Sequence, residues 1–139
     1  MKVSEAMTAQ VVTAKPTDTI QRVAKIMQEV DTGAVPIFDD GKVVGLVTDR
    51  DIGLRVVSSG GDLNGPISGA MSDHVLSCKE EDNVADAAAQ MASHQLRRLI
   101  VINDAGKLVG ILSLGDIATD YGNKQVGHVL EDISADAPA

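Results

Sequence analysis

The stretch Gly45-Leu-Val-Thr-Asp-Arg-Asp-Ile52 recurs later in the same chain as Gly110-Ile-Leu-Ser-Leu-Gly-Asp-Ile117. Both copies read glycine, two aliphatic residues, a hydroxyl residue, two variable positions, an aspartate and an isoleucine. Agreement over so many positions indicates an internal repeat, and that repeat decides how the rest of the chain is interpreted.

Each copy predicts a buried strand that runs into a helix. The hydroxyl residue, Thr48 or Ser113, is placed as the helix N-cap, and the aspartate, Asp51 or Asp116, lies in the first turn. Two interpretations stay open. In the first, hydroxyl and carboxylate form a capping box that satisfies backbone amides. In the second, they form a polar rim that holds a small ligand with vicinal hydroxyls, such as a ribose.

The segments before this stretch also match between the two halves. Each half predicts a short helical lead-in, an extended apolar piece, an amphipathic helix and a pair of strands joined by a turn. These elements are the lead-ins at 3–8 and 67–72, the apolar pieces at 11–13 and 75–77, the helices from Ile20 and Val84, and the turns at 39–41 and 103–106. Pro36 has no amide hydrogen, which places its strand at an edge or its nitrogen outside the ladder.

One such repeat exposes an apolar sheet face that it cannot bury alone. Two copies packed sheet to sheet around a pseudo-two-fold axis would bury both faces and leave paired clefts. We therefore predict an α/β (α+β) fold of two β-α-β-β-α repeats, at residues 1–57 and 67–121. A Gly-rich connector at 58–66 joins them, and a tail at 122–139 contains one or two helical turns around 126–130.

Composition narrows the classes of function. The 139 residues are 44% hydrophobic but only 1% aromatic, so the core must be aliphatic and base stacking is not available. The formal charge of −8, without a basic run, argues against nucleic-acid binding. One cysteine excludes an intrachain disulfide, and we see no signal segment or membrane span, so we expect a cytoplasmic protein without membrane contact.

With these residues in place, the chain resembles a pair of cystathionine β-synthase (CBS) domains, a Bateman module, over about residues 1 to 121. Members of that family bind AMP, ADP, ATP, NAD, S-adenosylmethionine or cyclic dinucleotides in the clefts between repeats, usually to regulate an attached or partner protein. The resemblance implies a regulatory module whose ligand is an adenine nucleotide, with no required cofactor and no catalysis. It also implies a homodimer and an unidentified effector protein.

The resemblance implies three sets of site residues. Thr48, Asp51, Ser113 and Asp116 would hold the two riboses. Val12, Thr13, Leu76, Ser77, Cys78, Pro36 and Ile111 would line the clefts beside the adenine. Arg97 and Arg98 would face phosphates, and Arg50 would either contact phosphate or point to solvent. Gly33-Ala34 matches Arg97-Arg98 in the first half, so we expect unequal sites. The sequence does not decide which of the two ribose sites lies next to Arg97 and Arg98.

Purely structural explanations of these residues also remain open. Arg97 and Arg98 could be a solvated strand edge that pairs with local carboxylates. His74, His94, His128 and Cys78 show no recognised ligand spacing, so we predict neither a metal site nor a catalytic site. The alternative function is a structural or interaction protein with empty or vestigial clefts, which acts through homodimer or partner assembly; an enzyme ranks third.

Overall fold

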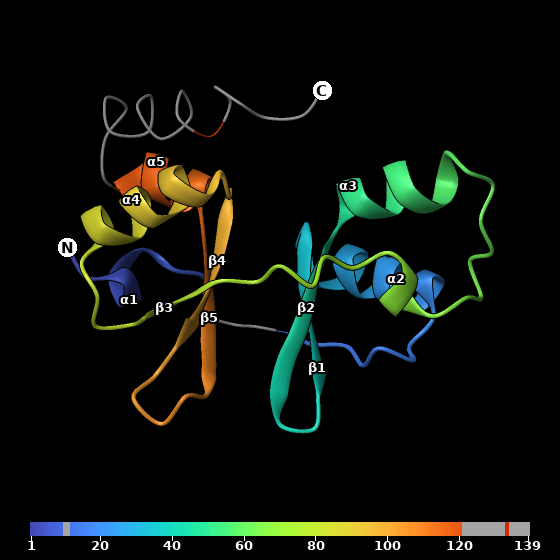
Figure 1. Ribbon diagram of the computed structural model, residues 1–139, viewed down its shortest axis with the longest axis horizontal. Helices are drawn as coiled ribbons and strands as arrows, with labels where there is room; N and C mark the ends of the chain where they lie inside the picture. Colours follow the sequence, from blue (N-terminus) through green and yellow to red (C-terminus); the bar gives the residue numbers. More distant parts are fainter. Residues whose placement is uncertain (10–11, 121–132, 134–139) are drawn as a thin grey trace. The chain divides into compact units, whose positions relative to one another are not determined.

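The computed structural model describes residues 1–9, 12–120 and 133 (Figure 1). The chain divides into two compact units. The terminal unit combines residues 1–11 with residues 76–139, and the central unit comprises residues 12–75. Each unit has its own aliphatic core and its own small sheet flanked by helices, which confirms the predicted mixed α/β fold.

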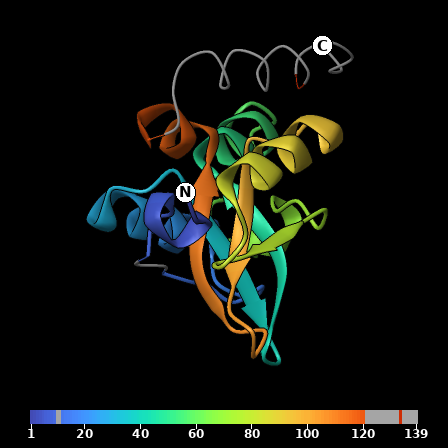
Figure 2. The same ribbon diagram turned by 90° about the vertical axis from the view of Figure 1, so that its left-hand side faces the viewer.

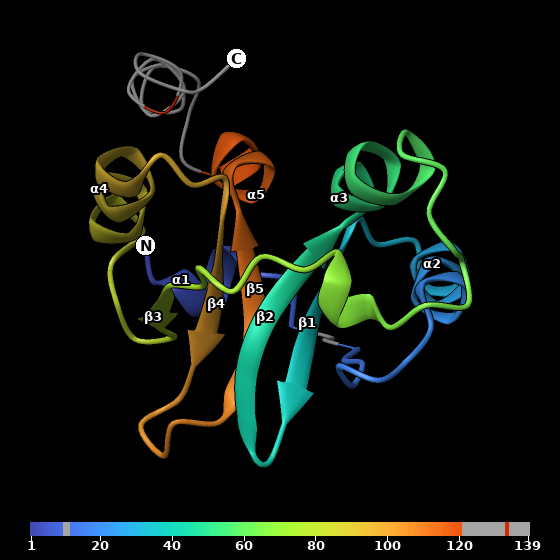
Figure 3. The ribbon, with the colours of Figure 1, turned by 45° about the vertical axis from the view of Figure 1, so that its right-hand side comes forward.

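The central unit is built on a hairpin. Strand β1 (Ala34–Asp39) pairs antiparallel with β2 (Lys42–Thr48), and helix α2 (Ile20–Val30) packs on β1. After β2 the chain enters α3 (Asp49–Asp51), which continues as the π-helix η1 (Ile52–Val57) (Figure 3). The 3-10 helix η2 (Ile67–Gly69) comes from the predicted second lead-in.

The terminal unit repeats this plan with one more strand. Strand β3 (Ser77–Lys79) pairs parallel with β4 (Arg98–Ile102), which pairs antiparallel with β5 (Leu108–Ser113). Helices α4 (Val84–His94) and α5 (Leu114–Asp120) contact each other, and the short α1 (Val3–Ala6) contacts both helices and β5 (Figure 2).

The two long helices begin where their sequences predict. The Thr19 hydroxyl accepts a hydrogen bond from the Arg22 amide at 3.1 Å, and the Asn83 side chain accepts one from the Ala85 amide at 3.0 Å. Met27 and Met91 are 8% and 0% exposed, which confirms their prediction as core residues. Burial of such a side chain contributes about 1.5–3 kcal/mol to stability.

Pro36 explains why the two sheets differ by one strand. Its carbonyl accepts a hydrogen bond from the Ala14 amide at 3.1 Å, on the edge of β1 away from β2, so its nitrogen lies outside the β1–β2 ladder, as predicted. In the terminal unit the matching residue is Ile100, whose amide donates to the Leu76 carbonyl at 3.1 Å. Proline cannot make that bond, so among the described residues the segment before α2 pairs with β1 through a single bridge, from Ala14 to Ile37.

Each unit also contains the lead-in of the other half of the sequence. Thr8 exchanges two backbone hydrogen bonds with Ile111 of β5, at 2.9 and 3.0 Å. Ser72 exchanges two with Leu46 of β2, both at 2.9 Å. The sequence repeats therefore do not coincide with the compact units, because both lead-ins pack on the hairpin of the opposite repeat.

The signature glycines allow this exchange. A Cβ on Gly110 would lie 2.8 Å from the Thr8 carbonyl oxygen and 2.6 Å from the Met7 sulfur. A Cβ on Gly45 would lie 3.0 Å from the Ser72 carbonyl oxygen and 2.5 Å from the Met71 sulfur. A lead-in crosses each glycine so closely that a side chain has no room there.

Of the tail, the structure describes one residue, Ile133. Ile133 is 4% exposed and belongs to the core of the terminal unit. The helical turn predicted around 126–130 lies outside the described residues. Across residues 1–9, 12–120 and 133, none of the helices has the length and apolar character that a membrane crossing needs.

Candidate functional site

The signature stretch of the central unit forms the predicted capping box at the end of β2. The Thr48 side-chain oxygen accepts a hydrogen bond from the Asp51 amide at 3.1 Å, and the Thr48 amide donates to Asp51 Oδ2 at 2.9 Å. Asp51 is part-buried, with 21% of its side chain exposed. We call Thr48, Asp49, Arg50 and Asp51, with Gly33, the central rim.

The terminal unit forms the same arrangement at the end of β5. The Asp116 amide donates to the Ser113 hydroxyl at 3.0 Å, and the Ser113 amide donates to Asp116 Oδ2 at 2.9 Å. Both residues are half-buried. We call Ser113, Leu114 and Asp116, with Arg97 and Arg98, the terminal rim. The capping interpretation is therefore confirmed for both copies, and it uses only one carboxylate oxygen of each aspartate.

The second oxygen of Asp51 faces a residue that sequence reasoning missed. Arg55 Nε lies 3.8 Å from Asp51 Oδ1, and Arg55 Nη1 donates to the Met71 carbonyl at 3.4 Å. Arg55 thus connects the central rim to the lead-in that crosses β2. The spacing of four residues between Asp51 and Arg55 on a helix was the available signal. Four residues after Asp116 the sequence has Asp120, which offers no cation.

The structure places both arginines of the second half at the terminal rim. Arg98 pairs directly with Ser113 across the β4–β5 ladder, so both side chains leave the same face of the sheet. The Arg97 carbonyl accepts a hydrogen bond from the Leu114 amide at 2.9 Å. Within the terminal unit, the backbones of both arginines therefore adjoin the signature stretch, and the Arg98 side chain leaves the sheet on the same face as that of Ser113.

The central rim has an acid at the same place. The Asp49 amide donates to the Gly33 carbonyl at 3.0 Å, which is the backbone contact that Leu114 and Arg97 make in the terminal rim. A Cβ on Gly33 would lie 3.2 Å from Asp49 Oδ2, so the carboxylate covers this glycine. Arg50 is exposed, and its amide donates to Asp49 Oδ1 at 2.8 Å.

The residues predicted to line the adenine divide between the units. Val12 and Thr13 lie in the extended piece before Ala14, and Pro36 is buried in β1. In the terminal unit, Ser77 is exposed on β3, whereas the neighbouring Cys78 side chain is 4% exposed and belongs to the core. Leu76 and Ile111 are half-buried. Cys78 can therefore reach a ligand only through its backbone.

The buried thiol of Cys78 predicts a pH effect on stability. Burial raises the pKa of Cys78 from its ordinary 9.0 to about 11, and the charge of Asp82 adds to the rise. The unfolded chain loses this proton first, so stability falls as pH rises from about 9 to 11, by about 2 to 3 kcal/mol for a full shift. Denaturant unfolding of wild type and Cys78→Ala between pH 8 and 11 measures it. Parallel pH dependences of the two proteins would contradict this prediction.

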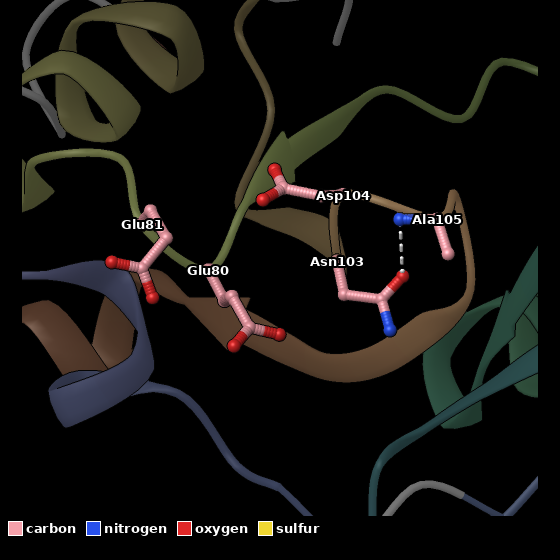
Figure 4. Close-up of a pocket in the computed structure, with 5 residues that line it drawn as sticks. All are labelled: Glu80, Glu81, Asn103, Asp104 and Ala105. Carbon is pink, nitrogen blue, oxygen red and sulfur yellow. Dashed lines mark hydrogen bonds between the residues drawn. The ribbon is translucent and has the colours of Figure 1, made fainter.

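One open depression lies at the opposite end of the β4–β5 hairpin from the terminal rim (Figure 4). Glu80, Glu81, Asn103, Asp104 and Ala105 line it. The Asn103 side-chain oxygen accepts hydrogen bonds from the Ala105 and Lys107 amides, both at 3.0 Å, so this amide stabilises the turn. Three carboxylates make the depression unsuitable for a phosphate, and none of the predicted site residues lines it.

The described residues contain no cluster of three histidine, cysteine or acidic side chains that could hold a metal ion. His74 is exposed on the segment before β3, whereas Cys78 is buried. These two residues therefore lie in different environments of the protein.

Comparison with known proteins identifies the repeat. The protein-family model described as the CBS domain matches residues 3–54 and again residues 66–122. The CBS domain-containing protein YhcV of Bacillus subtilis is 41% identical over 133 residues, which cover 95% of this chain and 94% of that protein.

Solved structures agree with this match. A CBS domain protein from Pyrobaculum aerophilum complexed with AMP aligns with a TM-score of 0.78 and 29% identity, over 94% of this chain and 97% of that one. The CBS domain pair of protein MJ0100, in complex with 5′-methylthioadenosine and S-adenosyl-L-methionine, aligns with a TM-score of 0.77 and 26% identity, over 89% and 98%. The chain therefore belongs to the CBS domain family, and it carries two copies of the domain in tandem.

Proposed function

We propose that this protein is a regulatory module that binds an adenosine-containing small molecule and reports its level to a partner or to an oligomer of the chain. The observation that carries the proposal is the duplicated rim, in which a hydroxyl and a carboxylate are fixed at a strand end in both halves. The solved relatives complexed with AMP and with S-adenosyl-L-methionine support the choice of ligand class.

The chemistry of the rim suits a ribose. A carboxylate accepts several hydrogen bonds, and the capping amide occupies only Oδ2 of Asp51 or Asp116. The capping bond leaves Oδ1 for the vicinal hydroxyls of a sugar in both rims, in the central rim in exchange for the long Arg55 contact. The capping box fixes the carboxylate before a ligand arrives, so binding costs little ordering entropy. The proposal includes no catalytic step.

A second candidate is an interaction protein in which the aspartates serve only as caps. The complete capping boxes favour it, as do the apolar Leu54 and Val57 of η1, which are 58% and 63% exposed. Such side chains suit a homodimer contact or a partner surface. In this candidate the protein acts through assembly, and nucleotides have no effect.

Thermal unfolding against a panel of adenine compounds separates the two candidates. A ligand of the native state must raise the melting temperature, because it binds the folded chain and not the unfolded one. We expect at least one of AMP, ADP, ATP, NAD and S-adenosylmethionine to raise it at millimolar concentration, and guanosine nucleotides to do so less. If no adenine compound shifts the transition, the interaction protein is the better account.

Arg98→Ala tests the phosphate role at the terminal rim. Each phosphate that pairs with a guanidinium gains a charge-assisted hydrogen bond, so we expect losses of affinity that grow from AMP to ATP, to roughly 10-fold or more for ATP. Adenosine should bind almost as before. Isothermal titration with adenosine, AMP and ATP measures the series, and Arg22→Ala, at an exposed position of α2, is the control. Equal losses for all three ligands would mean that Arg98 does not contact phosphate.

A further inference from the structure

Each rim contains the same kind of backbone hydrogen bond, but the charges of the residues that make it differ between the two rims. In the central rim the residue after the hydroxyl is Asp49, whose amide donates to Gly33 at 3.0 Å. In the terminal rim it is Leu114, whose amide donates to Arg97 at 2.9 Å. A glycine hydrogen-bonded to the backbone of an aspartate in one unit thus corresponds to an arginine hydrogen-bonded to the backbone of a leucine in the other.

The side chains at this contact are placed differently as well. Asp49 is exposed, and its Oδ2 lies 3.2 Å from the Cβ position of Gly33. Gly33 is the counterpart of Arg97, so in the central unit a negative charge lies where the terminal unit has the start of an arginine side chain. Leu114 is 8% exposed and packs into the core, which leaves Arg97 with no acid at this contact. The exchange of residues therefore reverses the local sign of charge.

The other charged residues of the two rims do not cancel this difference in charge. At the central rim, the cations Arg50 and the neighbouring Arg55 are balanced by Asp49 and Asp51, and Arg55 already contacts Asp51 and the Met71 carbonyl. In the terminal rim, Arg97 and Arg98 outnumber Asp116. A phosphorylated ligand thus meets a neutral rim with an acid at Gly33 in one unit, and a net positive rim in the other.

We propose that the two rims select different classes of adenosine ligand. The terminal rim takes a nucleotide with 5′-phosphates, and the central rim takes an adenosine whose 5′ substituent carries no phosphate and is neutral or positively charged, as in a sulfonium. This selection rests on the proposed function, and Asp49 is the residue that sets it. The exposed position of Asp49 keeps the repulsion moderate and sensitive to salt.

The test measures each rim alone by isothermal titration of the full chain. Asp116→Ala leaves the central rim, and Asp51→Ala leaves the terminal rim; Asp116→Asn and Asp51→Asn, which keep the shape of the cap, serve if the alanine variants unfold. The probes are adenosine, S-adenosylmethionine and ATP. We expect the central rim to bind ATP roughly 10-fold more weakly than adenosine at low salt, and the terminal rim to reverse this order.

Asp49→Asn in the Asp116→Ala background tests the selecting residue. It keeps the side-chain shape but removes the charge, so ATP should gain about five-fold in affinity for the central rim at low salt and less at high salt, while adenosine is unchanged. Glu29→Gln, an exposed acid on α2 of the same unit, is the matched control and should change nothing.

The outcomes separate this inference from the proposed function. If adenosine and ATP bind the central rim equally well and Asp49→Asn changes neither, the selection is wrong but ligand binding stands. If neither rim binds any of the three probes in the wild-type chain, the proposed function itself fails. If ATP binds more weakly at the central rim and Asp49→Asn restores it, the selection by Asp49 is supported.

Discussion

Gly110→Ala is expected to lower the free energy of unfolding by about 2 to 3 kcal/mol, which is a large share of the stability of a small domain. The new methyl group would lie 2.8 Å from the Thr8 carbonyl oxygen, and a backbone atom cannot move aside as a flexible side chain can. The lead-in must therefore shift off β5 and lose the two hydrogen bonds between Thr8 and Ile111. Urea unfolding measures the energy.

Hydrogen exchange and a matched glycine give this prediction its control. Exchange of the Thr8 and Ile111 amides should accelerate in Gly110→Ala, whereas the amides of α2 in the other unit should change little. Gly53→Ala, in η1 with no heavy atom within 4 Å of its Cβ position, should leave the stability unchanged or raise it slightly. Equal stability of the two variants would mean that the lead-in does not cross Gly110.

The elements of both units could be predicted because their signals are local. Thr19 and Asn83 mark helix starts, apolar spacing places Met27 and Met91 in the core, and the turns fix the hairpins. Pro36 indicated that its strand lies at an edge or that its nitrogen lies outside the ladder, and the structure shows the nitrogen outside the β1–β2 ladder. Each of these features depends on residues only a few positions apart, so one sequence is enough to find them.

The partnership of the lead-ins could not be predicted in the same way. Thr8 and Ile111 are far apart in the sequence, and the residues around Thr8 do not indicate which hairpin Thr8 pairs with. The signal was present in the signature itself, since Gly45 and Gly110 interrupt aliphatic strands where a side chain would normally pack. It indicated a close approach, but not the segment that approaches. The contact between Gly33 and Asp49 was hidden for the same reason.

Asp116→Ala and Ser113→Ala together distinguish a ligand site from a cap. Each variant removes one half of the capping box, so each should cost about 1 kcal/mol of stability. Only Asp116→Ala removes the carboxylate oxygen that would accept the ribose hydroxyls, and hydrogen bonds to a charged group are worth roughly 1.5–3 kcal/mol. We therefore expect Asp116→Ala to weaken binding at the terminal rim by roughly 10- to 100-fold.

Ser113→Ala should weaken the same binding by only a few-fold, because Asp116 keeps its charge and its bond from the Ser113 amide. Titration with AMP, in the Asp51→Ala background so that one rim is observed, gives both values, and urea unfolding gives the two stabilities. If both variants lose stability and neither loses affinity, the carboxylates are helix caps alone. If Asp116→Ala loses much more affinity than Ser113→Ala at equal stability, the carboxylate has a role that capping does not explain, and the duplicated signature is a binding motif as well as a structural one.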